Sequence, residues 1–356
     1  MNPREKKVKL GFVGAGFVGQ IAHIANFRDV QTCELHALSE LRPELATAVA
    51  RHYGFQKTYA STQELLEDPL VDAVVAITRR PHTGPTALEI LQSGKHLLTE
   101  KPLCHSVAQA ESLLAAAQTS GAIHSVGYMR RHDAGVAKAH AKFRDLIASN
   151  DLGPLLSAKA YCWGGDSYQG SRPEVAVEEY AYPELKSWPL SPDFMPADLA
   201  MDYANFVNVY CHTLNLLRFF LGEPTQVVRA NLRNPKEQEI SLEFERIPAQ
   251  LNFGVRPSTD WQEGFEFEFA KGSFALSLPP AFAKTRIATY QWSGRNGEVE
   301  KSSPAGGEKW AFRRQAEAFV DDVRTKKFPL ASAEDAIEDL RLIEKIWMVH
   351  LKELTL

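Results

Sequence analysis

The sequence is short of cysteine and has no long apolar run. Its four cysteines, Cys33, Cys104, Cys162 and Cys211, lie far apart and form no C-x-x-C pair, so they suggest neither a disulfide framework nor a zinc site. No apolar run approaches the length that crosses a bilayer, and residues 1–7 are polar with no signal-type apolar stretch after them. We therefore expect a soluble cytoplasmic protein with no metal and no membrane partner.

The sequence also has little excess charge of either sign. It carries 40 Lys and Arg against 44 Asp and Glu, and its basic pairs, at 79–80, 130–131 and 313–314, are scattered. This pattern argues against a nucleic-acid surface and favours a small-molecule ligand. With 44% hydrophobic content, the 356 residues can bury a large core and exceed the usual size of a single one, so we expect two domains.

A glycine fingerprint stands near the start of the chain. Gly14, Gly16 and Gly19 form a G-x-G-x-x-G pattern between an apolar strand, 8–13, and a short helix, 20–27. Gly14 allows a tight turn, Gly16 lets the backbone approach a pyrophosphate, and Gly19 lets the helix pack close to the sheet. The pyrophosphate would lie against the first amides of the helix. The predicted contacts are Gly14, Gly16, Phe17, Val18 and Gly19.

An acidic residue follows at the distance that a dinucleotide site requires. Glu40 ends the next predicted strand, 33–40, and lies 21 residues after Gly19, where a carboxylate can bind the adenosine ribose hydroxyls. A carboxylate repels a 2'-phosphate, which favours NAD over NADP. Arg42 can reach the same place and partly reverse that preference, so the cofactor is NAD or NADP, with NAD favoured.

Apolar strands and helices alternate through the first 128 residues. This alternation predicts a doubly wound parallel sheet of six strands, a Rossmann domain over 1–128, in which ligands bind beyond the carboxyl ends of the strands. Three strand ends are therefore candidate site segments: 78–82, 99–103 and 127–133.

The pattern changes beyond residue 128. Strands of alternating polarity between 226 and 292, with helices before and after them, predict an α+β domain over 129–356 with a large open, mostly antiparallel sheet. The last helices can pack back on the Rossmann domain. The irregular segment 164–200 is long enough to be a binding loop or a partner arm. Four phenylalanines of the sheet indicate either an oligomer interface or an ordinary core: Phe265, Phe267, Phe269 and Phe274.

Two residues have the chemistry of hydride-transfer enzymes. Lys101, in Glu100-Lys101-Pro102, directly follows a parallel strand, where a lysine can stabilise a developing alkoxide, and Pro102 can fix the backbone through a cis bond. His212 lies in an apolar helix and titrates near neutral pH, as a general base should. Asn208, one turn earlier, faces the same way. Taken alone, such a lysine is most often a surface residue and such a histidine is by default a core residue; it is the position of Lys101 after a parallel strand that favours catalysis.

These motifs together resemble the family of glucose-fructose oxidoreductase, inositol dehydrogenase and rhizopine-catabolism proteins (Gfo/Idh/MocA). The resemblance rests on the fingerprint, on residues 94–102 and 127–133, and on His212 before the sequence 221–224. It implies an NAD(P)-dependent oxidoreductase of sugars, cyclitols or related polyols, often a homodimer or homotetramer through the open sheet.

The resemblance also assigns residue roles. It makes Lys101 and His212 catalytic. It adds to the cofactor site Thr78, Arg79, Glu100 and Lys101. It places at the substrate Met129, Arg130, Trp163, Asn208 and His212.

The sequence departs from the family pattern at three positions. Asn208 and Asn215 stand where the family usually has aspartates, and an amide cannot stabilise a protonated His212 by charge. Arg79 replaces a proline, so Arg79 and Arg80 either bind a phosphate or an acidic substrate or are simply solvated. Two alternatives therefore stay open: an NAD-recycling, non-redox glycoside-processing enzyme that acts through a transient keto sugar, and a non-catalytic dinucleotide-binding sensor or partner subunit.

Overall fold

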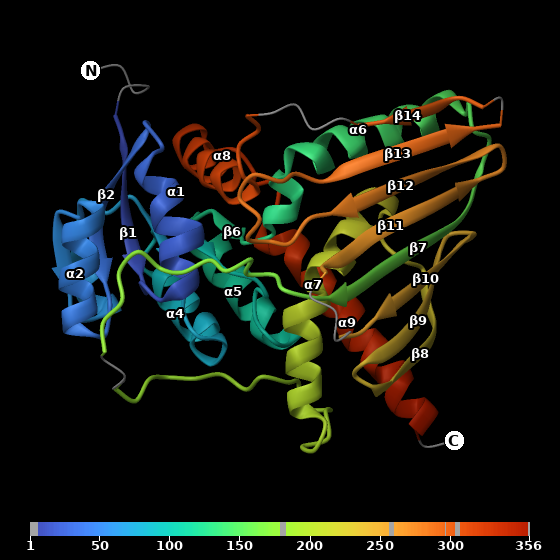
Figure 1. Ribbon diagram of the computed structural model, residues 1–356. Helices are drawn as coiled ribbons and strands as arrows, with labels where there is room; N and C mark the ends of the chain where they lie inside the picture. Colours follow the sequence, from blue (N-terminus) through green and yellow to red (C-terminus); the bar gives the residue numbers. More distant parts are fainter. Residues whose placement is uncertain (1–5, 179–182, 256–259, 296, 303–306, 355–356) are drawn as a thin grey trace. The chain divides into compact units, whose positions relative to one another are not determined.

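The computed structural model describes residues 6–178, 183–255, 260–295, 297–302 and 307–354. Its first unit contains a six-stranded parallel sheet in the order β3-β2-β1-β4-β5-β6 (Figure 1). This confirms the predicted doubly wound sheet. The strands are β1 (Val8–Val13), β2 (Cys33–Ser39), β3 (Lys57–Tyr59), β4 (Ala73–Ala76), β5 (His96–Thr99) and β6 (His124–Val126).

The helices of this unit begin and end where their capping residues place them. Ser61 and Ser106 cap their helices by accepting the backbone N–H groups of Glu64 and Gln109, each at 3.2 Å, the arrangement of a capping box. Gly54 ends the second helix with a φ of 83°. The helix after the fingerprint starts as a π-helix, η1 (Gly19–Ile24). The α-helices are α1 (Ala25–Arg28), α2 (Pro43–Tyr53), α3 (Thr62–Glu67), α4 (Arg80–Gln92) and α5 (Val107–Ser120).

An aromatic cluster lies at the centre of the first core. Phe12 meets Phe27 and Phe55 edge to face, with ring centroids 5.6 Å apart in both pairs. The late helix α8 (Ala311–Thr325) adds Phe319 to the same cluster. Strand β4 is buried along its whole length, as expected of a central parallel strand.

The chain forms two compact units, each made of three separate stretches of sequence. The first unit comprises Met1–Tyr128, Ser171–Ala204 and Phe312–Leu340. The sequence places a boundary at 128 and assigns both later stretches to the second domain, although it also allows the last helices to pack back on the Rossmann domain. They join the first unit because Val175 and Val177, together with the apolar face of α8, pack against its core.

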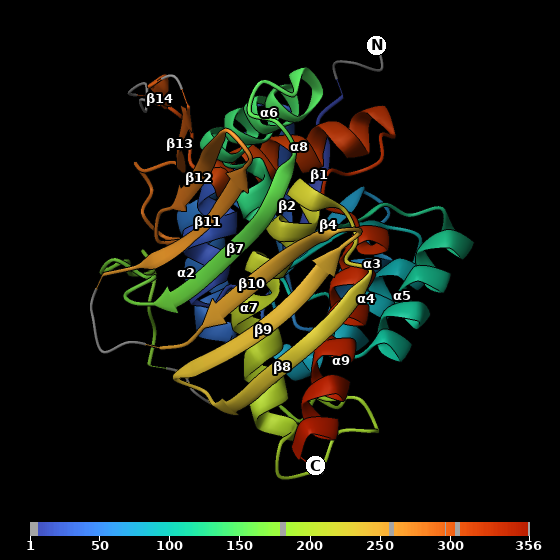
Figure 2. The same cartoon turned by 90° about the vertical axis from the view of Figure 1, so that its right-hand side faces the viewer.

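The second unit contains an eight-stranded sheet, in the order β14-β13-β12-β11-β7-β10-β9-β8 (Figure 2). Strands β7 and β10 pair in parallel and the other neighbours are antiparallel, which confirms the predicted mostly antiparallel sheet. Strand β14 and the short β3 of the first unit carry no apolar run, so neither strand could be predicted from the sequence. The strands are β7 (Leu155–Gly164), β8 (Gln226–Asn234), β9 (Glu237–Phe244), β10 (Ile247–Phe253), β11 (Gln262–Phe269), β12 (Gly272–Leu278), β13 (Thr289–Gly294) and β14 (Val299–Lys301).

Helices cover one face of this sheet and bury its phenylalanines. The four sheet phenylalanines are at most 5% exposed, and Phe267 packs against Phe143 and Phe220. They therefore form a core, one of the two interpretations of the sequence. The opposite face is polar, with Ser241 bonded to Gln250 at 2.8 Å. The helices of this unit include η2 (Met129–His132), α6 (Ala134–Ser149), α7 (Ala200–Leu221) and the end of α9 (Ala333–Leu354).

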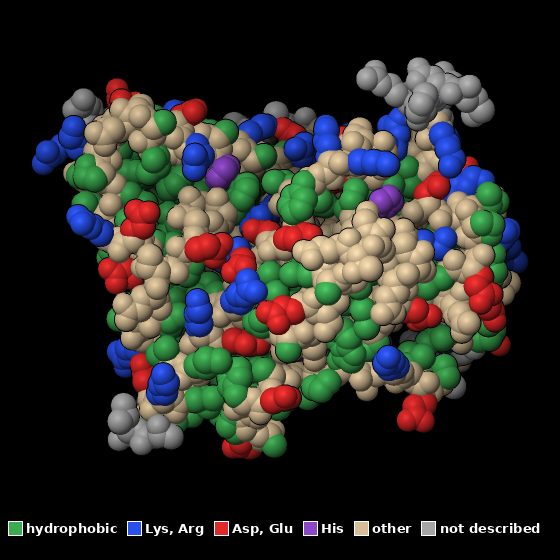
Figure 3. All heavy atoms as spheres, turned by 180° about the vertical axis from the view of Figure 1, so that it is seen from behind, with side chains coloured by type: hydrophobic (Ala, Val, Ile, Leu, Met, Phe, Trp, Pro, Cys, Tyr) green, Lys and Arg blue, Asp and Glu red, His purple; other side chains and the backbone are tan. Residues whose placement is uncertain are grey.

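Acidic and basic side chains are interspersed on the face that Figure 3 shows, as a nearly balanced composition predicts. Within the described residues, no helix has the length and apolar character needed to cross a membrane.

Candidate functional site

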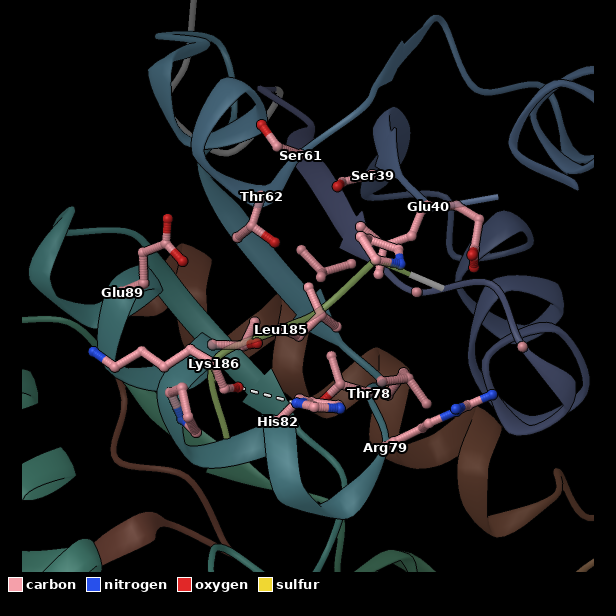
Figure 4. A pocket seen from close by; sticks show the side chains of 18 of the residues that line it. Ser39, Glu40, Ser61, Thr62, Thr78, Arg79, His82, Glu89, Leu185 and Lys186 are labelled. Atoms are coloured by element: carbon pink, nitrogen blue, oxygen red, sulfur yellow. Dashed lines mark hydrogen bonds between the residues drawn. The ribbon is translucent and has the colours of Figure 1, made fainter. Parts of the chain in front are cut away.

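A cavity of about 1120 Å³ opens beside the fingerprint in the first unit (Figure 4). Small-molecule sites usually measure roughly 300–1000 Å³, so this cavity has room for an extended ligand. Its walls come from the ends of β1, β2 and β4, from α3 and α4, and from segment 183–187.

The glycines of the fingerprint fit a close approach by a ligand. Gly14 has a φ of +89°, and a side chain there would overlap the carbonyl oxygen of Ile77. The atom nearest to a methyl built on Gly16 is Nη2 of Arg42, at 4.0 Å, so Gly16 lies open to the cavity. This is the surface that a pyrophosphate requires.

Glu40 directly follows β2, and its carboxylate accepts four hydrogen bonds, one of them from the backbone N–H of Arg42 to Oε1 at 3.2 Å. Its Oε2 accepts the N–H of Ala15 at 2.7 Å and Nη2 of Arg42 at 3.0 Å, and its Oε1 accepts Nε of Arg42 at 2.8 Å. Burial alone would raise the pKa of Glu40, but the hydrogen bonds from Arg42 and Ala15 outweigh it and lower that pKa. The carboxylate is therefore ionised and fixed at the cavity wall.

Most of the predicted cofactor residues line this cavity. The predicted cofactor residues that line it are Gly14, Gly16, Phe17, Val18, Gly19, Glu40, Thr78 and Arg79. The other two, Glu100 and Lys101, are not among the described residues of the lining.

Glu100 and Lys101 follow β5 and are tied to the fingerprint helix. His23 Nε2 lies 2.7 Å from Glu100 Oε1, and Glu100 Oε2 accepts the backbone N–H of Lys101 at 3.1 Å. The Lys101–Pro102 peptide bond is cis, as the sequence allowed. His23 is a residue of this site that no sequence motif singled out. Its signal is its place four residues after Gly19, one helical turn on and facing the same way.

In the second unit, Arg130 belongs to a buried polar network. It is 3% exposed, and its terminal nitrogens donate to Glu263 Oε2 and to the carbonyl oxygen of Pro279, both at 2.6 Å. Glu263 also accepts the Trp261 indole N–H at 3.2 Å and the Thr213 hydroxyl at 3.3 Å. The predicted substrate residue Arg130 is thus engaged with groups far along the chain.

His212 and Asn208 lie one turn apart on α7, and both are half-buried. Thr213, directly after His212, is fully buried and bonded to Glu263, which fixes this turn of the helix. Asn215 accepts Nε of Arg131 at 2.7 Å through its side-chain oxygen. The side-chain amide of Asn215 is therefore a hydrogen-bond acceptor for the Arg131 guanidinium.

The remaining predicted substrate residues are Met129 and Trp163. Met129 is buried in η2. Trp163 is half-buried near the end of β7, where the register with β11 shifts, so it is opposite no residue of β11. His212 and these residues belong to the second unit, whereas Lys101 belongs to the first.

Among the described residues, no group of three or more His, Cys, Asp or Glu side chains is placed to hold a metal ion. The four cysteines are buried, and none of them forms a disulfide.

Comparison with known proteins gives consistent matches. Residues 8–128 match the model of the Gfo/Idh/MocA oxidoreductase family, with its NAD-binding Rossmann fold. The chain is 28% identical to 1,5-anhydro-D-fructose reductase of Ensifer adhaerens over 341 residues, 93% of this chain and 92% of that one. It is 31% identical to the scyllo-inositol 2-dehydrogenase (NAD(+)) of Bacillus subtilis over 44% of this chain and 45% of that enzyme. The structure of an aldose-aldose oxidoreductase from Caulobacter crescentus superposes with a TM-score of 0.76 at 20% identity and covers 98% of both chains.

Proposed function

Because the chain belongs to the Gfo/Idh/MocA family of oxidoreductases, we propose that it interconverts a hydroxyl and a ketone on a sugar, cyclitol or related polyol. A bound NAD(P) would supply the hydride acceptor or donor. The observation that carries the proposal is the fingerprint cavity of the first unit, with Lys101 at the end of β5 in the same sheet.

Lys101 is the proposed electrophile. Its ammonium donates to the reacting oxygen and stabilises the negative charge that develops there. The backbone that carries it is held by the bond from its N–H to Glu100, which His23 fixes in turn. This arrangement restricts Lys101 before substrate binds, so less ordering remains to be done in the reaction.

His212 is the proposed general base. Its imidazole takes the hydroxyl proton in the oxidation and returns it in the reduction. Asn208, one turn earlier on α7, is the proposed substrate partner, because an amide can both donate to and accept from a hydroxyl. The bond between Asn215 and Arg131 supports a structural role for the amide at 215, because its side-chain oxygen accepts from that buried guanidinium.

We propose that NAD is preferred over NADP. Glu40 lines the cavity at the ribose position, and its carboxylate repels a 2'-phosphate. Arg42 is held by that carboxylate and would have to leave it to meet such a phosphate. In titrations, wild type should bind NADH at least about tenfold more tightly than NADPH, and Glu40→Ser should reduce that ratio.

The substrate proposal follows the named relatives, one a reductase of an anhydro sugar and one an inositol dehydrogenase. The relatives favour neither the cofactor-recycling glycoside enzyme nor the sensor.

We also propose a homodimer or homotetramer formed through the polar face of the eight-stranded sheet, which light scattering of the purified protein tests.

The test of function is a substrate panel. Purified protein is offered inositols, aldoses and 1,5-anhydro-D-fructose with NAD(P)+ or NAD(P)H, and the absorbance of the reduced nicotinamide is followed. Turnover with a stoichiometric change in cofactor supports the proposal. Product formed with no net change in cofactor would favour the glycoside-processing alternative, and tight NAD(H) binding without turnover would favour the sensor.

A further inference from the structure

A segment distant in sequence forms one wall of the fingerprint cavity. Residues 183–187 line it, although they follow the fingerprint by more than 150 positions and carry no recognisable motif. Figure 4 shows this segment running across the cavity at Leu185 and Lys186, with a dashed line to His82.

Three hydrogen bonds fix residues 186–189 to the rest of the first unit. His82 Nδ1 donates to the carbonyl oxygen of Lys186 at 3.0 Å, since a carbonyl can only accept. The N–H of Trp188 donates to the carbonyl oxygen of Pro81 at 2.8 Å. Gln109, on α5, donates its amide to the carbonyl oxygen of Pro189 at 2.9 Å. The segment is thus held at the first turns of both α4 and α5.

Trp188 is the side chain that seats the segment. Its indole occupies the space beside Gly84 on α4, and a methyl group at Gly84 would overlap the ring. Gly84 is therefore required by an element that lies more than 100 residues later in the sequence. A glycine in the interior of a helix weakens it, so its presence here is explained by this contact.

The wall lies on the adenosine side of the cavity. The opposite lining includes residues 61–63, which follow β3 at one edge of the sheet, and Glu40 at the ribose position. Lys101, at the proposed reacting end, follows β5, which lies on the other side of β1 from β3. Lys101 is not among the described residues that line the cavity. Pro85, Leu88 and Leu185 give this part of the cavity apolar surface on which a purine ring can pack, beside the charged Glu89 and Lys186.

We propose that residues 183–189 form a clasp over the adenosine half of the dinucleotide, and that the dinucleotide leaves only when the clasp opens. The proposal rests on the proposed cofactor site, but not on hydride transfer. The clasp adds contacts to bound cofactor and slows its release, because its hydrogen bonds and the Trp188 contact must break first.

The experiment measures NADH dissociation by stopped-flow fluorescence, with excess unlabelled NAD+ as the chase, or with the NADPH pair where that binds more tightly. Trp188→Ala and Gly84→Ala should each speed dissociation about tenfold, because each removes the contact that seats the clasp. The double variant should dissociate no faster than Trp188→Ala, because both changes break the same contact. Trp292→Ala, which removes a half-buried tryptophan of β13, is the matched control and should leave the rate unchanged.

A milder variant covers the case in which Gly84→Ala does not fold. Gln109→Glu keeps the oxygen that caps α5 by accepting the N–H of His105, but it loses the donor to Pro189, so dissociation should be about threefold faster. Affinity for ADP-ribose should fall in the clasp variants, and affinity for nicotinamide mononucleotide should not. Two results would overturn the clasp. One is that folded Trp188→Ala and Gln109→Glu release NADH at the wild-type rate. The other is that Gly84→Ala speeds release as much in the Trp188→Ala background as it does in the wild type. Absence of turnover bears on the proposed function alone.

Discussion

The two units hold their charged groups in different ways. In the first unit, Glu40 meets Arg42 two positions away, beside a cavity. In the second, Arg130 meets Glu263 across 133 positions, and both side chains are at most 3% exposed. The first arrangement leaves a carboxylate at a ligand site, and the second fastens a helical turn to a distant strand. The Glu40 pair of the first unit therefore serves binding, and the Arg130 pair of the second unit serves the fold.

The largest expected effect comes from breaking the buried pair. Arg130→Met leaves the buried carboxyl group of Glu263 without its main partner, so we expect a loss of about 3–5 kcal/mol in the free energy of unfolding, measured with urea. Arg130→Met/Glu263→Leu should recover most of that loss, since no charge is then left unpaired. A rise in KM with unchanged stability would instead mean that Arg130 binds substrate and contributes little to the fold.

The next effect tests the reacting end of the first unit. Lys101→Met should lower turnover about 100- to 1000-fold, because the developing alkoxide loses its donor, while NADH affinity stays the same. Lys95→Met is the control, because Lys95 lies in the same motif but donates to backbone oxygens of Asp68 and Val71. Retention of wild-type turnover by Lys101→Met, measured with the substrate from the panel, would remove Lys101 from the mechanism.

The sequence predicts the two arrangements unequally well, for a physical reason. Glu40 and the three glycines act through neighbours a few positions away, so spacing alone places them. The partners of Arg130, and the indole that requires Gly84, come from segments more than 100 residues away and leave no local pattern. His23 is intermediate, since its helical position is readable but its partner Glu100 follows another strand. The motif-bearing cavity could therefore be predicted, and the clasp could not.

Buried imidazoles in the first unit should make its stability depend on pH. Burial lowers the pKa of His124 to about 3, and burial with the nearby Arg80 charge lowers that of His105 to about 4. The unfolded chain therefore takes up these protons first as pH falls below about 6.5. For each imidazole, the free energy of unfolding then falls by about 1.4 kcal/mol per pH unit down to about pH 4. Thermal melts from pH 8 to pH 5 should show a shallower loss in His124→Gln. Equal slopes in the two proteins would contradict a neutral, buried His124.

The smallest effect separates two similar pairs within the first unit. His23 lies 2.7 Å from Glu100 and His36 lies 2.9 Å from Asp68, and both imidazoles are buried. His23→Asn should lower kcat about tenfold with little change in KM, because Glu100 no longer fixes the backbone of Lys101. His36→Asn should lower the melting temperature and leave kcat unchanged. Equal kcat in the two variants would make His23 a purely structural residue.

The most direct test is the fate of one hydrogen. With the substrate that the panel identifies, deuterated at the reacting carbon, the reduced nicotinamide should carry the deuterium, and turnover should fall by orders of magnitude in Lys101→Met and in His212→Ala. Product that forms with no deuterium on the cofactor, or with both variants fully active, would contradict the assignment of these two side chains to a single redox step.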